Sequence, residues 1–323
     1  MSEFDLINQY FKSAAINRKD VVLGIGDDCA LLSPPPGKLL AISTDTLISG
    51  VHFPHTTSAE NIGYKSLAVN LSDLAAMGAD PAWVSLAISL PDANDIWLAA
   101  FMRGFNQLAS AYNVSLIGGD TTRGTLSVSV NIVGFVEAGS ALRRSAAKAG
   151  HIICVTGTLG DAGAGLDIVL NQKTLTGDNE FLVDRLNRPQ PRINAGQILS
   201  RYAVAAIDIS DGLLSDLSHI CEASQCGANI HLEKIPLSVQ LINYYEATPD
   251  WQAIINAGDD YELCFCCAAD EVEAIQQQMA EQHLQMTPIG EITEAAGINC
   301  LLHNKLQNFA INNGYNHFTD EKR

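Results

Sequence analysis

Short apolar runs rich in β-branched residues alternate along this chain with longer segments of helical periodicity. In its first half, residues 39–43, 83–90, 114–118 and 126–136 have the composition of strands. Helices are predicted between them, from about Ala59 to Met77, with a capping-box signature at Thr57 and Glu60, and from about Asp95 to Tyr112. This alternation predicts an α/β fold of mixed α+β type, because each helix can cover the sheet that its neighbouring strands build.

The length of 323 residues suits two domains, at a soft average of roughly 150 residues each. Around residues 138–150 the sequence becomes small, basic and polar, and an apolar run then begins afresh. We therefore predict one domain over residues 1–140 and a second over 141–323. The second contains a Gly-rich turn at 156–166, strands at 203–209 and 261–267, and a helix at 211–224.

The chain is strongly acidic, with 36 Asp and Glu against 19 Lys and Arg and a formal net charge of −17. Such a charge argues against nucleic acid or an anionic membrane as the main partner. A phosphorylated substrate could still bind if cations lay between it and the carboxylates. The positions of the carboxylates therefore decide which function is expected.

The eight cysteines are scattered without a C-x-x-C pair, which favours buried reduced thiols over metal ligands or disulfides. The start of the chain has neither the basic region nor the continuous apolar region of a signal peptide. We therefore expect a cytoplasmic protein.

Six aspartates fall where apolar runs end: Asp27, Asp28, Asp45, Asp120, Asp208 and Asp211. A solvated turn explains any one such aspartate, but it explains six in the same setting poorly. Ligands of open α/β sheets bind beyond the ends of the strands. We interpret these residues as a ligand site.

Asp73 supports the same interpretation from a helix. It lies in the last turns of the predicted helix at 59–77, where the helix dipole disfavours a carboxylate. With Ser66 and Asn70 it forms a polar stripe on an otherwise apolar segment. The stripe is therefore expected to face a buried polar site, where a metal ion would offset the cost.

Carboxylates with hydroxyl oxygens form the ligand set of Mg²⁺, and Ser43, Thr44 and Asp45 could supply three oxygens from one strand end. Mg²⁺ recruits only one or two protein carboxylates and completes its shell with water and phosphate. This many carboxylates therefore imply several ions, and several ions imply a polyphosphate.

The common ATP-binding motifs are absent from the sequence, so a phosphate needs another cradle. Backbone N–H groups could supply it at Gly118–Asp120 or at the Gly-rich turn, whose glycines are Gly157, Gly160, Gly163 and Gly165. Close helix packing is an equal explanation for the last two. Arg143 and Arg144 are either a phosphate-binding pair or a solubilising one, and His52 makes either a structural hydrogen bond or a substrate contact.

Six motifs match a known family in order and spacing: GIGDDCALL, AISTDTLISGVHF, YKSLAVNLSDLAAMGADP, LIGGDTTRG, IDISDGLLSDL and DDYELCF. Over essentially its whole length the chain resembles the thiamine-monophosphate kinases, of the superfamily that includes aminoimidazole ribonucleotide synthetase. The resemblance implies an N-terminal domain that binds metal and ATP and dimerises through its sheet, and a C-terminal α/β domain that closes over the active site. It implies a homodimer that converts ATP and thiamine monophosphate into ADP and thiamine diphosphate with several Mg²⁺ ions.

The resemblance also implies site residues. The metal ligands would be Asp28, Ser43, Thr44, Asp45, Asp73, Asp120, Asp208 and Asp211. Gly119, Asp120, Arg144 and Ser210 would contact ATP, and His52, Asp259 and Tyr315 would contact thiamine monophosphate. Asp45, Asp120, Arg144 and Asp211 would be the catalytic group.

This chain departs from the family pattern at three places. AGDDYEL replaces GGEDYEL, with Ala257 and Asp259; RSAAKAGH replaces RSGAKPGD; and Asn312 and Asn313 replace an aromatic near the terminal GY. All three concern the thiamine pocket rather than the metal ligands.

An acceptor that is itself a phosphate is already ionised at pH 7, so the reaction needs no general base and is expected to be a direct in-line transfer. The alternatives within the superfamily are aminoimidazole ribonucleotide synthetase, selenophosphate synthetase and a hydrogenase-maturation protein. The sequence disfavours the last two, because it has no reactive Cys near the N-terminus and no C-terminal Cys tail. A nucleotide-binding regulator with structural metals is the alternative from another class.

Overall fold

The computed structural model describes residues 7–12, 18–202 and 204–309. The chain forms two compact units, Met1–Ala141 with Asn187–Ile193, and Leu142–Leu186 with Asn194–Arg323. The sequence predicted a single break and not the return of residues 187–193 to the first unit. Arg188 in this segment contacts Gln107 at 2.6 Å and lies over the ring of Tyr64 at 4.7 Å. These contacts join residues far apart in the sequence, so no local sequence pattern predicts them.

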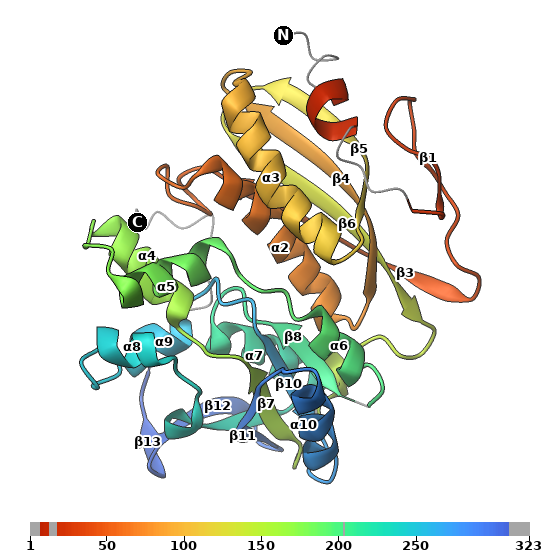
Figure 1. Cartoon of the computed structure of the whole chain (residues 1–323). Helices are drawn as coiled ribbons and strands as arrows, with labels where there is room; N and C mark the ends of the chain where they lie inside the picture. The colour runs from red at the N-terminus through yellow and green to blue at the C-terminus, as the bar shows by residue number, and fades with distance from the viewer. Residues whose placement is uncertain (1–6, 13–17, 203, 310–323) are drawn as a thin grey trace. The chain divides into compact units, whose positions relative to one another are not determined.

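The first unit is built on a four-stranded sheet of order β3-β6-β4-β5. The strands are β3 (Lys38–Ile48), β4 (Asp80–Leu90), β5 (Ser115–Arg123) and β6 (Ser127–Glu137). Helix α3 (Asp95–Ala111) connects the parallel strands β4 and β5, and helices α2 (Ala59–Ala76) and α3 cover one face of the sheet (Figure 1). The predicted strands and helices of this half are confirmed, although β3 and β5 run on past their apolar residues.

The two helices start and cross at defined residues. Ser58 caps α2 by accepting from the amide of Asn61. The predicted capping box at Thr57 and Glu60 is therefore wrong, because the cap lies one residue later. The helix backbones approach closely where a β-carbon on Gly63 would lie 2.0 Å from the carbonyl oxygen of Phe101. Only glycine fits there, and this crossing fixes α2 against the sheet.

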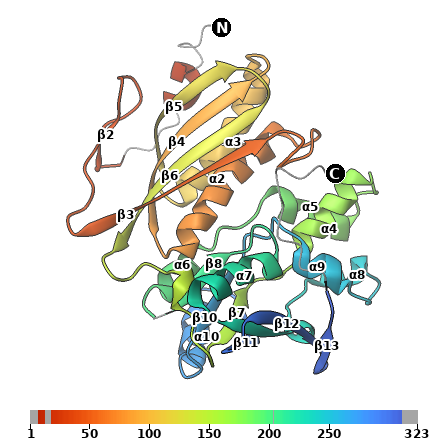
Figure 2. The ribbon, with the colours of Figure 1, turned by 180° about the vertical axis from the view of Figure 1, so that it is seen from behind.

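The opposite face of the sheet is partly open (Figure 2). One end is covered by the ribbon of β1 (Val21–Leu23) and β2 (Leu31–Leu32), where Val21 and Leu32 pack against Trp83 and Phe135. Along β3, by contrast, Ile42 remains 61% exposed. The alternation of the strand thus places Ser43, Asp45 and Leu47 under α2 and Ile42, Thr44 and Thr46 on the open face.

The second unit contains a seven-stranded sheet of order β13-β12-β9-β11-β7-β10-β8, in which only β12 and β9 pair in parallel. Its strands are β7 (Ile152–Thr156), β8 (Ala205–Asp208), β9 (Gly227–His231), β10 (Leu263–Cys267), β11 (Met286–Thr293), β12 (Gly297–Leu302) and β13 (Lys305–Gln307). Its helices are α4 (Asp161–Leu170), α5 (Gly177–Asn187), α6 (Ile193–Leu199), α7 (Leu213–Ser224), α8 (Val239–Tyr244), α9 (Trp251–Asn256) and α10 (Val272–Glu281). The mixed α/β fold predicted from sequence is confirmed in both units.

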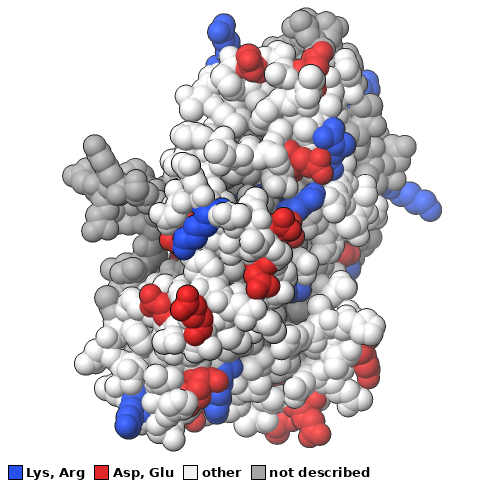
Figure 3. Space-filling model, turned by 60° about the vertical axis from the view of Figure 1, so that its left-hand side comes forward, with Lys and Arg blue, Asp and Glu red and all other residues white. Residues whose placement is uncertain are grey.

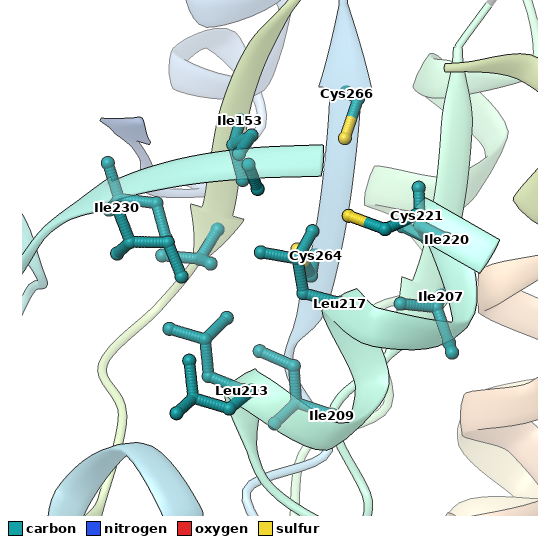
Figure 4. Close-up of a cluster of buried hydrophobic side chains, with 14 of the residues drawn as sticks. Ile153, Ile207, Ile209, Leu213, Leu217, Ile220, Cys221, Ile230, Cys264 and Cys266 are labelled. Atoms are coloured by element: carbon teal, nitrogen blue, oxygen red, sulfur yellow. The ribbon is translucent and has the colours of Figure 1, made fainter. Parts of the chain in front are cut away.

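The core of the second unit lies between this sheet and α7 (Figure 4). Ile207, Leu217 and Ile230 are fully buried there together with the thiols of Cys264 and Cys266. All eight cysteines are free and seven are buried, which confirms the prediction of buried reduced thiols except at exposed Cys29.

Among the described helices, none combines the length and the apolar character that crossing a membrane requires. On the face drawn in Figure 3, acidic and basic side chains are interspersed and do not form a basic patch.

Candidate active site

The core of the candidate site is formed where α2 crosses β3. The hydroxyl of Ser43 donates to the carboxylate of Asp73, and the side-chain oxygen of Asn70 accepts from the amide of Asp45 at 3.2 Å. Asn70 is fully buried, and its NH₂ group is held by the carbonyl of Ser66 at 3.0 Å. The polar stripe predicted on this helix therefore does face a polar site, through Asn70 and Asp73.

Two carboxyl groups are crowded at this crossing. Burial, the largest cause, and the neighbouring Asp73 together raise the pKa of Asp45 to about 7. A divalent cation at this position would allow both groups to ionise. The donors present are carboxylate, hydroxyl and amide oxygens, which match the preference of Mg²⁺.

Three members of the predicted ligand set lie differently from the expectation. Asp45 and Asp120 lie inside β3 and β5 rather than beyond their ends, because backbone pairing continues after the apolar residues stop. The hydroxyl of Thr44 lies on the opposite face of the sheet from Ser43 and Asp45, where it accepts from Asn131 Nδ2 at 2.6 Å. That hydroxyl would therefore contact a different ion from one held by Ser43 and Asp73.

A cavity of about 550 Å³ lies in the same unit. Its lining includes Asp27, Asp28, Gly118, Gly119, Asp120 and Thr121, together with Lys12 and Cys29. Strand register places Asp45, Val130, Leu86 and Gly119 in one row across the sheet. Three strand spacings separate the ends of this row, about 14 Å. Asp120 follows Gly119 and falls in the next row, with Ala87, Ser129 and Thr46, so it lies on the open face, and neither strand spacing nor face lets it share an ion with Asp45.

The second unit carries the other predicted carboxylates at the end of β8. Asp208 ends the strand, and the turn that follows is fixed by Asp216, whose carboxylate accepts from the amides of Ser210 and Asp211 at 3.0 Å each. Burial, with the charges of Asp208 and Asp211, raises the pKa of Asp216 to about 8, although the hydrogen bonds from the amides of Ser210 and Asp211 act in the opposite direction. Sequence reasoning missed Asp216, although it belongs to the motif IDISDGLLSDL; its position four residues into the next helix was the available signal.

The predicted substrate contact Asp259 lies beside this turn. Its amide donates to the carbonyl of Ser210 at 2.9 Å, and Gly258 lets the chains approach, since a β-carbon there would lie 2.4 Å from that same oxygen. The structure thus brings together Ser210, Asp211 and Asp259, which are far apart in the sequence.

Two amides of the Gly-rich turn at 156–166, one of the two candidate phosphate cradles, are already bonded within the protein. The N-terminus of α4 is already occupied by the carboxylate of Asp260, which accepts from the amides of Gly160 at 2.7 Å and Ala162 at 3.3 Å. Gly163 and Gly165 are packing positions, because β-carbons on them would lie 2.4 Å from Ala257 and 2.2 Å from the carbonyl of Leu182.

The remaining predicted contacts are placed as follows. Arg144 is exposed, and its carbonyl is held by the hydroxyl of Ser224 at the C-terminal end of α7, whereas Ser210 and Asp211 precede the N-terminal end. His52 accepts from the amide of Ile48 at 3.0 Å through Nδ1, which leaves the proton on Nε2. Tyr315 lies outside the described residues.

Within the described ranges, no three His, Cys, Asp or Glu side chains converge on one point that could hold a metal ion. The carboxylates instead form separate small groups, around Asp45 and Asp73, along the cavity at Asp28 and Asp120, and around Asp208 and Asp211. This arrangement suits ions that take only one or two protein carboxylates each.

Comparison with known proteins identifies the class. Residues 26–136 match the family model described as AIR synthase related protein, N-terminal domain, and residues 148–302 match the corresponding C-terminal domain. Together these models define a two-domain protein of the AIR synthase-like superfamily.

Full-length relatives define the family within that class. The thiamine-monophosphate kinase of Haemophilus influenzae is 44% identical over 326 residues, covering 100% of this chain and 99% of its own. The crystal structure of thiamine-monophosphate kinase from Stenotrophomonas maltophilia is 45% identical, covers 93% of this chain and 96% of its own, and superposes with a TM-score of 0.86. A structure described as AaThiL complexed with AMPPCP and TMP is 31% identical, covers 98% of this chain and 97% of its own, and gives a TM-score of 0.78. The chain belongs to the thiamine-monophosphate kinase family.

Proposed function

We propose that this kinase transfers the γ-phosphoryl group of ATP directly to the phosphate of thiamine monophosphate, with a cluster of Mg²⁺ ions, as the final step of thiamine diphosphate formation. The observation that carries the proposal is the row that joins the Asp45–Asp73 crossing to Gly119, which lines a 550 Å³ cavity together with Asp28 and Asp120. The related structure described with AMPPCP and TMP supports the choice of both substrates.

The ions would be held by Asp28, Ser43, Thr44, Asp45, Asp73 and Asp120 in the first unit and by Asp208 and Asp211 in the second. When bound, they supply neutralisation of the charge on the phosphates of both substrates. The oxygen donors at the α2–β3 crossing fit this role, because burial and the charge of Asp73 both disfavour the ionised form of Asp45 and a bound cation would offset both effects.

The protein's own groups would bind and orient the reactants. Gly119 would present its backbone to the nucleotide, and a β-carbon there would lie 1.8 Å from the carbonyl oxygen of Leu86, so only glycine fits. Ser210 would contact the nucleotide from a turn that Asp216 holds rigid, and Arg144 would add positive charge. Asp259, His52 and Tyr315 would contact thiamine monophosphate. No residue need remove a proton, since the acceptor phosphate is already ionised at pH 7.

The direct test is to incubate the purified protein with Mg-ATP and thiamine monophosphate and to separate the products by chromatography. Stoichiometric ADP and thiamine diphosphate, lost on adding EDTA, are expected. Free thiamine and an aminoimidazole precursor serve as alternative acceptors. ATP binding without thiamine diphosphate formation would contradict the proposal and favour another superfamily activity or a regulatory role.

We also propose a cytoplasmic homodimer. The seven buried free thiols suit a reducing compartment. The open sheet face offers Leu40 and Ile42, which are 48% and 61% exposed, as the apolar centre of an interface with a second copy. Light scattering is expected to give twice the chain mass, and Ile42→Glu is expected to give a monomer.

A further inference from the structure

A buried ionic network lies beneath the segment that carries Asp259, and the proposed reaction gives it no role. Arg185, on α5, donates from Nη2 to Glu262 at 2.9 Å, and its Nε lies 3.6 Å from the carboxylate of Asp161. The side chain of Arg185 is 10% exposed, and both acidic side chains are 0% exposed. Burying three charged groups carries a desolvation cost, which is offset only where their geometry is good and further hydrogen bonds satisfy them.

Buried contacts fix Asp260 and Glu262, which alternate with Asp259 and Tyr261 along the segment 259–262. Glu262 is held by Arg185 and also by the hydroxyl of Thr156 at 2.6 Å. Asp260 is held by the amides of Gly160 and Ala162 at the start of α4. Asp260 and Glu262 thus point into the unit from both ends of a three-residue stretch.

The residues beside these anchors adopt a conformation that side chains rarely take. Asp259 has a φ of 69° and Tyr261 a φ of 51°, both left-handed. Such a backbone persists only where its surroundings over-determine it. The buried anchors at 260 and 262 supply that constraint, and they leave Asp259 and Tyr261 as the half-buried residues of the segment.

Gly157 leaves the space that the carboxylate of Glu262 occupies. Gly157 has a φ of 54°, and a β-carbon on it would lie 2.2 Å from Glu262 Oε1. The Gly-rich turn is therefore shaped around the carboxylate of Glu262 and around the helix start that binds Asp260.

We infer that Arg185 is a positioning residue: by holding Glu262, it locks the left-handed segment at 259–261 and so fixes the carboxylate of Asp259 for the substrate. This inference rests on the proposed function. In AGDDYEL, Asp259 replaces a glutamate of the family pattern, and the shorter side chain requires a rigid backbone more than the longer one does. Arg185 acts on the segment through its ion pair with Glu262.

The test uses full-length Arg185→Met and Arg185→Lys, with Lys173→Met as the matched control. Lys173 pairs with Asp167 at 2.7 Å on the surface of the same unit, and both side chains are over 40% exposed. Because Arg185→Met leaves buried carboxyl groups without their guanidinium, the double variant Arg185→Met with Glu262→Gln, which removes both charges, is measured beside it.

Hydrogen exchange of the peptide spanning 257–263 provides a readout that is independent of the reaction. Exchange is expected to accelerate about tenfold in Arg185→Met and in the double variant, the equivalent of one hydrogen bond to a charged group, and less in Arg185→Lys. Lys173→Met is expected to match the wild type. Wild-type exchange in folded Arg185→Met protein would overturn the inference.

Kinetics then test the consequence for the substrate. KM for thiamine monophosphate is expected to rise about tenfold in Arg185→Met and partly recover in Arg185→Lys, while KM for ATP stays unchanged. A parallel rise in both KM values, or a fall in kcat alone, would also overturn the inference. A wild-type protein without thiamine diphosphate formation would instead contradict the proposed function, and the exchange experiment would still decide whether Arg185 fixes the segment.

Discussion

Carboxyl groups are buried in two regions of this molecule, and the surroundings differ. At the α2–β3 crossing, burial and the neighbouring charge of Asp73 both raise the pKa of Asp45. Around Arg185, burial also raises the pKa of Asp260 and Asp161, but the guanidinium and, for Asp260, the amides at the start of α4 act in the opposite direction. The second region contains its own positive charge, whereas the first is suited to receive one from outside.

This difference separates the proposed ligand site at the α2–β3 crossing from the structural network around Arg185, although both contain the same residue types. Removing one group from each region, and measuring both activity and the free energy of unfolding, tests whether the two regions differ in this way.

The largest effect is expected at Asp45. Replacing Asp45 by Asn removes a charge from the proposed metal site and should lower kcat by about 10³-fold or more, the scale of several kcal/mol of charge stabilisation. Its free energy of unfolding in EDTA should equal or exceed that of the wild type, because the repulsion with Asp73 is relieved. Activity assays and urea denaturation measure the two quantities.

Asp270→Asn, at an exposed position in the second unit, is the control and should leave both quantities unchanged. Full activity in Asp45→Asn would remove the α2–β3 crossing from the active site.

Arg185→Met should show the reverse pattern in stability. Removing the guanidinium leaves buried Glu262 and Asp161 uncompensated, which typically costs about 3–5 kcal/mol of unfolding free energy. Urea denaturation is the measurement, and Lys173→Met, which breaks an exposed pair, should cost less than about 1 kcal/mol. Equal losses in these two variants would show that the buried network is no more important than a surface pair.

Magnesium should distinguish the two regions directly. At about 100 times its dissociation constant, Mg²⁺ should stabilise the wild-type protein by about 2.7 kcal/mol for each site, seen as a rise in Tm. Asp45→Asn should lose part of this rise, whereas Arg185→Lys should keep all of it. A rise that is the same in Asp45→Asn and in the wild type would place the ions elsewhere.

The sequence predicted the elements of the fold well because hydrophobic periodicity and β-branched runs are local signals. It also predicted that Asp73 and Asn70 face a polar site, since a polar stripe on an apolar helix can be read from spacing alone. It placed Asp45 and Asp120 at strand ends, because composition changes there although the backbone pairing of β3 and β5 continues.

Long-range partners could not be predicted in the same way. The pairing of Asp260 with the start of α4 joins residues about a hundred positions apart, so the turn at 156–166 looked like an empty anion site. Arg185 likewise gave no signal, since one arginine in a polar helix is normally solvated. Asp216 is an intermediate case, because its motif was recognised but its contacts with Ser210 and Asp211 depend on the geometry of the turn.

The smallest effect for one step of the measurement is the change per pH unit, which tests the network at Asp260. Burial raises the pKa of Asp260 from its ordinary value near 3.8 to about 8, so between these values the native state holds one proton more than the unfolded state. The free energy of unfolding therefore falls as pH rises, by about 1.4 kcal/mol per pH unit from this group. Asp260→Asn cannot titrate, so in EDTA between pH 5 and about 8 its unfolding free energy should decline less steeply than that of the wild type by this amount.

Asp161 and Asp216 keep their raised pKa values in the variant, so some decline remains. Parallel curves for Asp260→Asn and the wild type would show that Asp260 is ionised throughout, with the start of α4 fully balancing its charge.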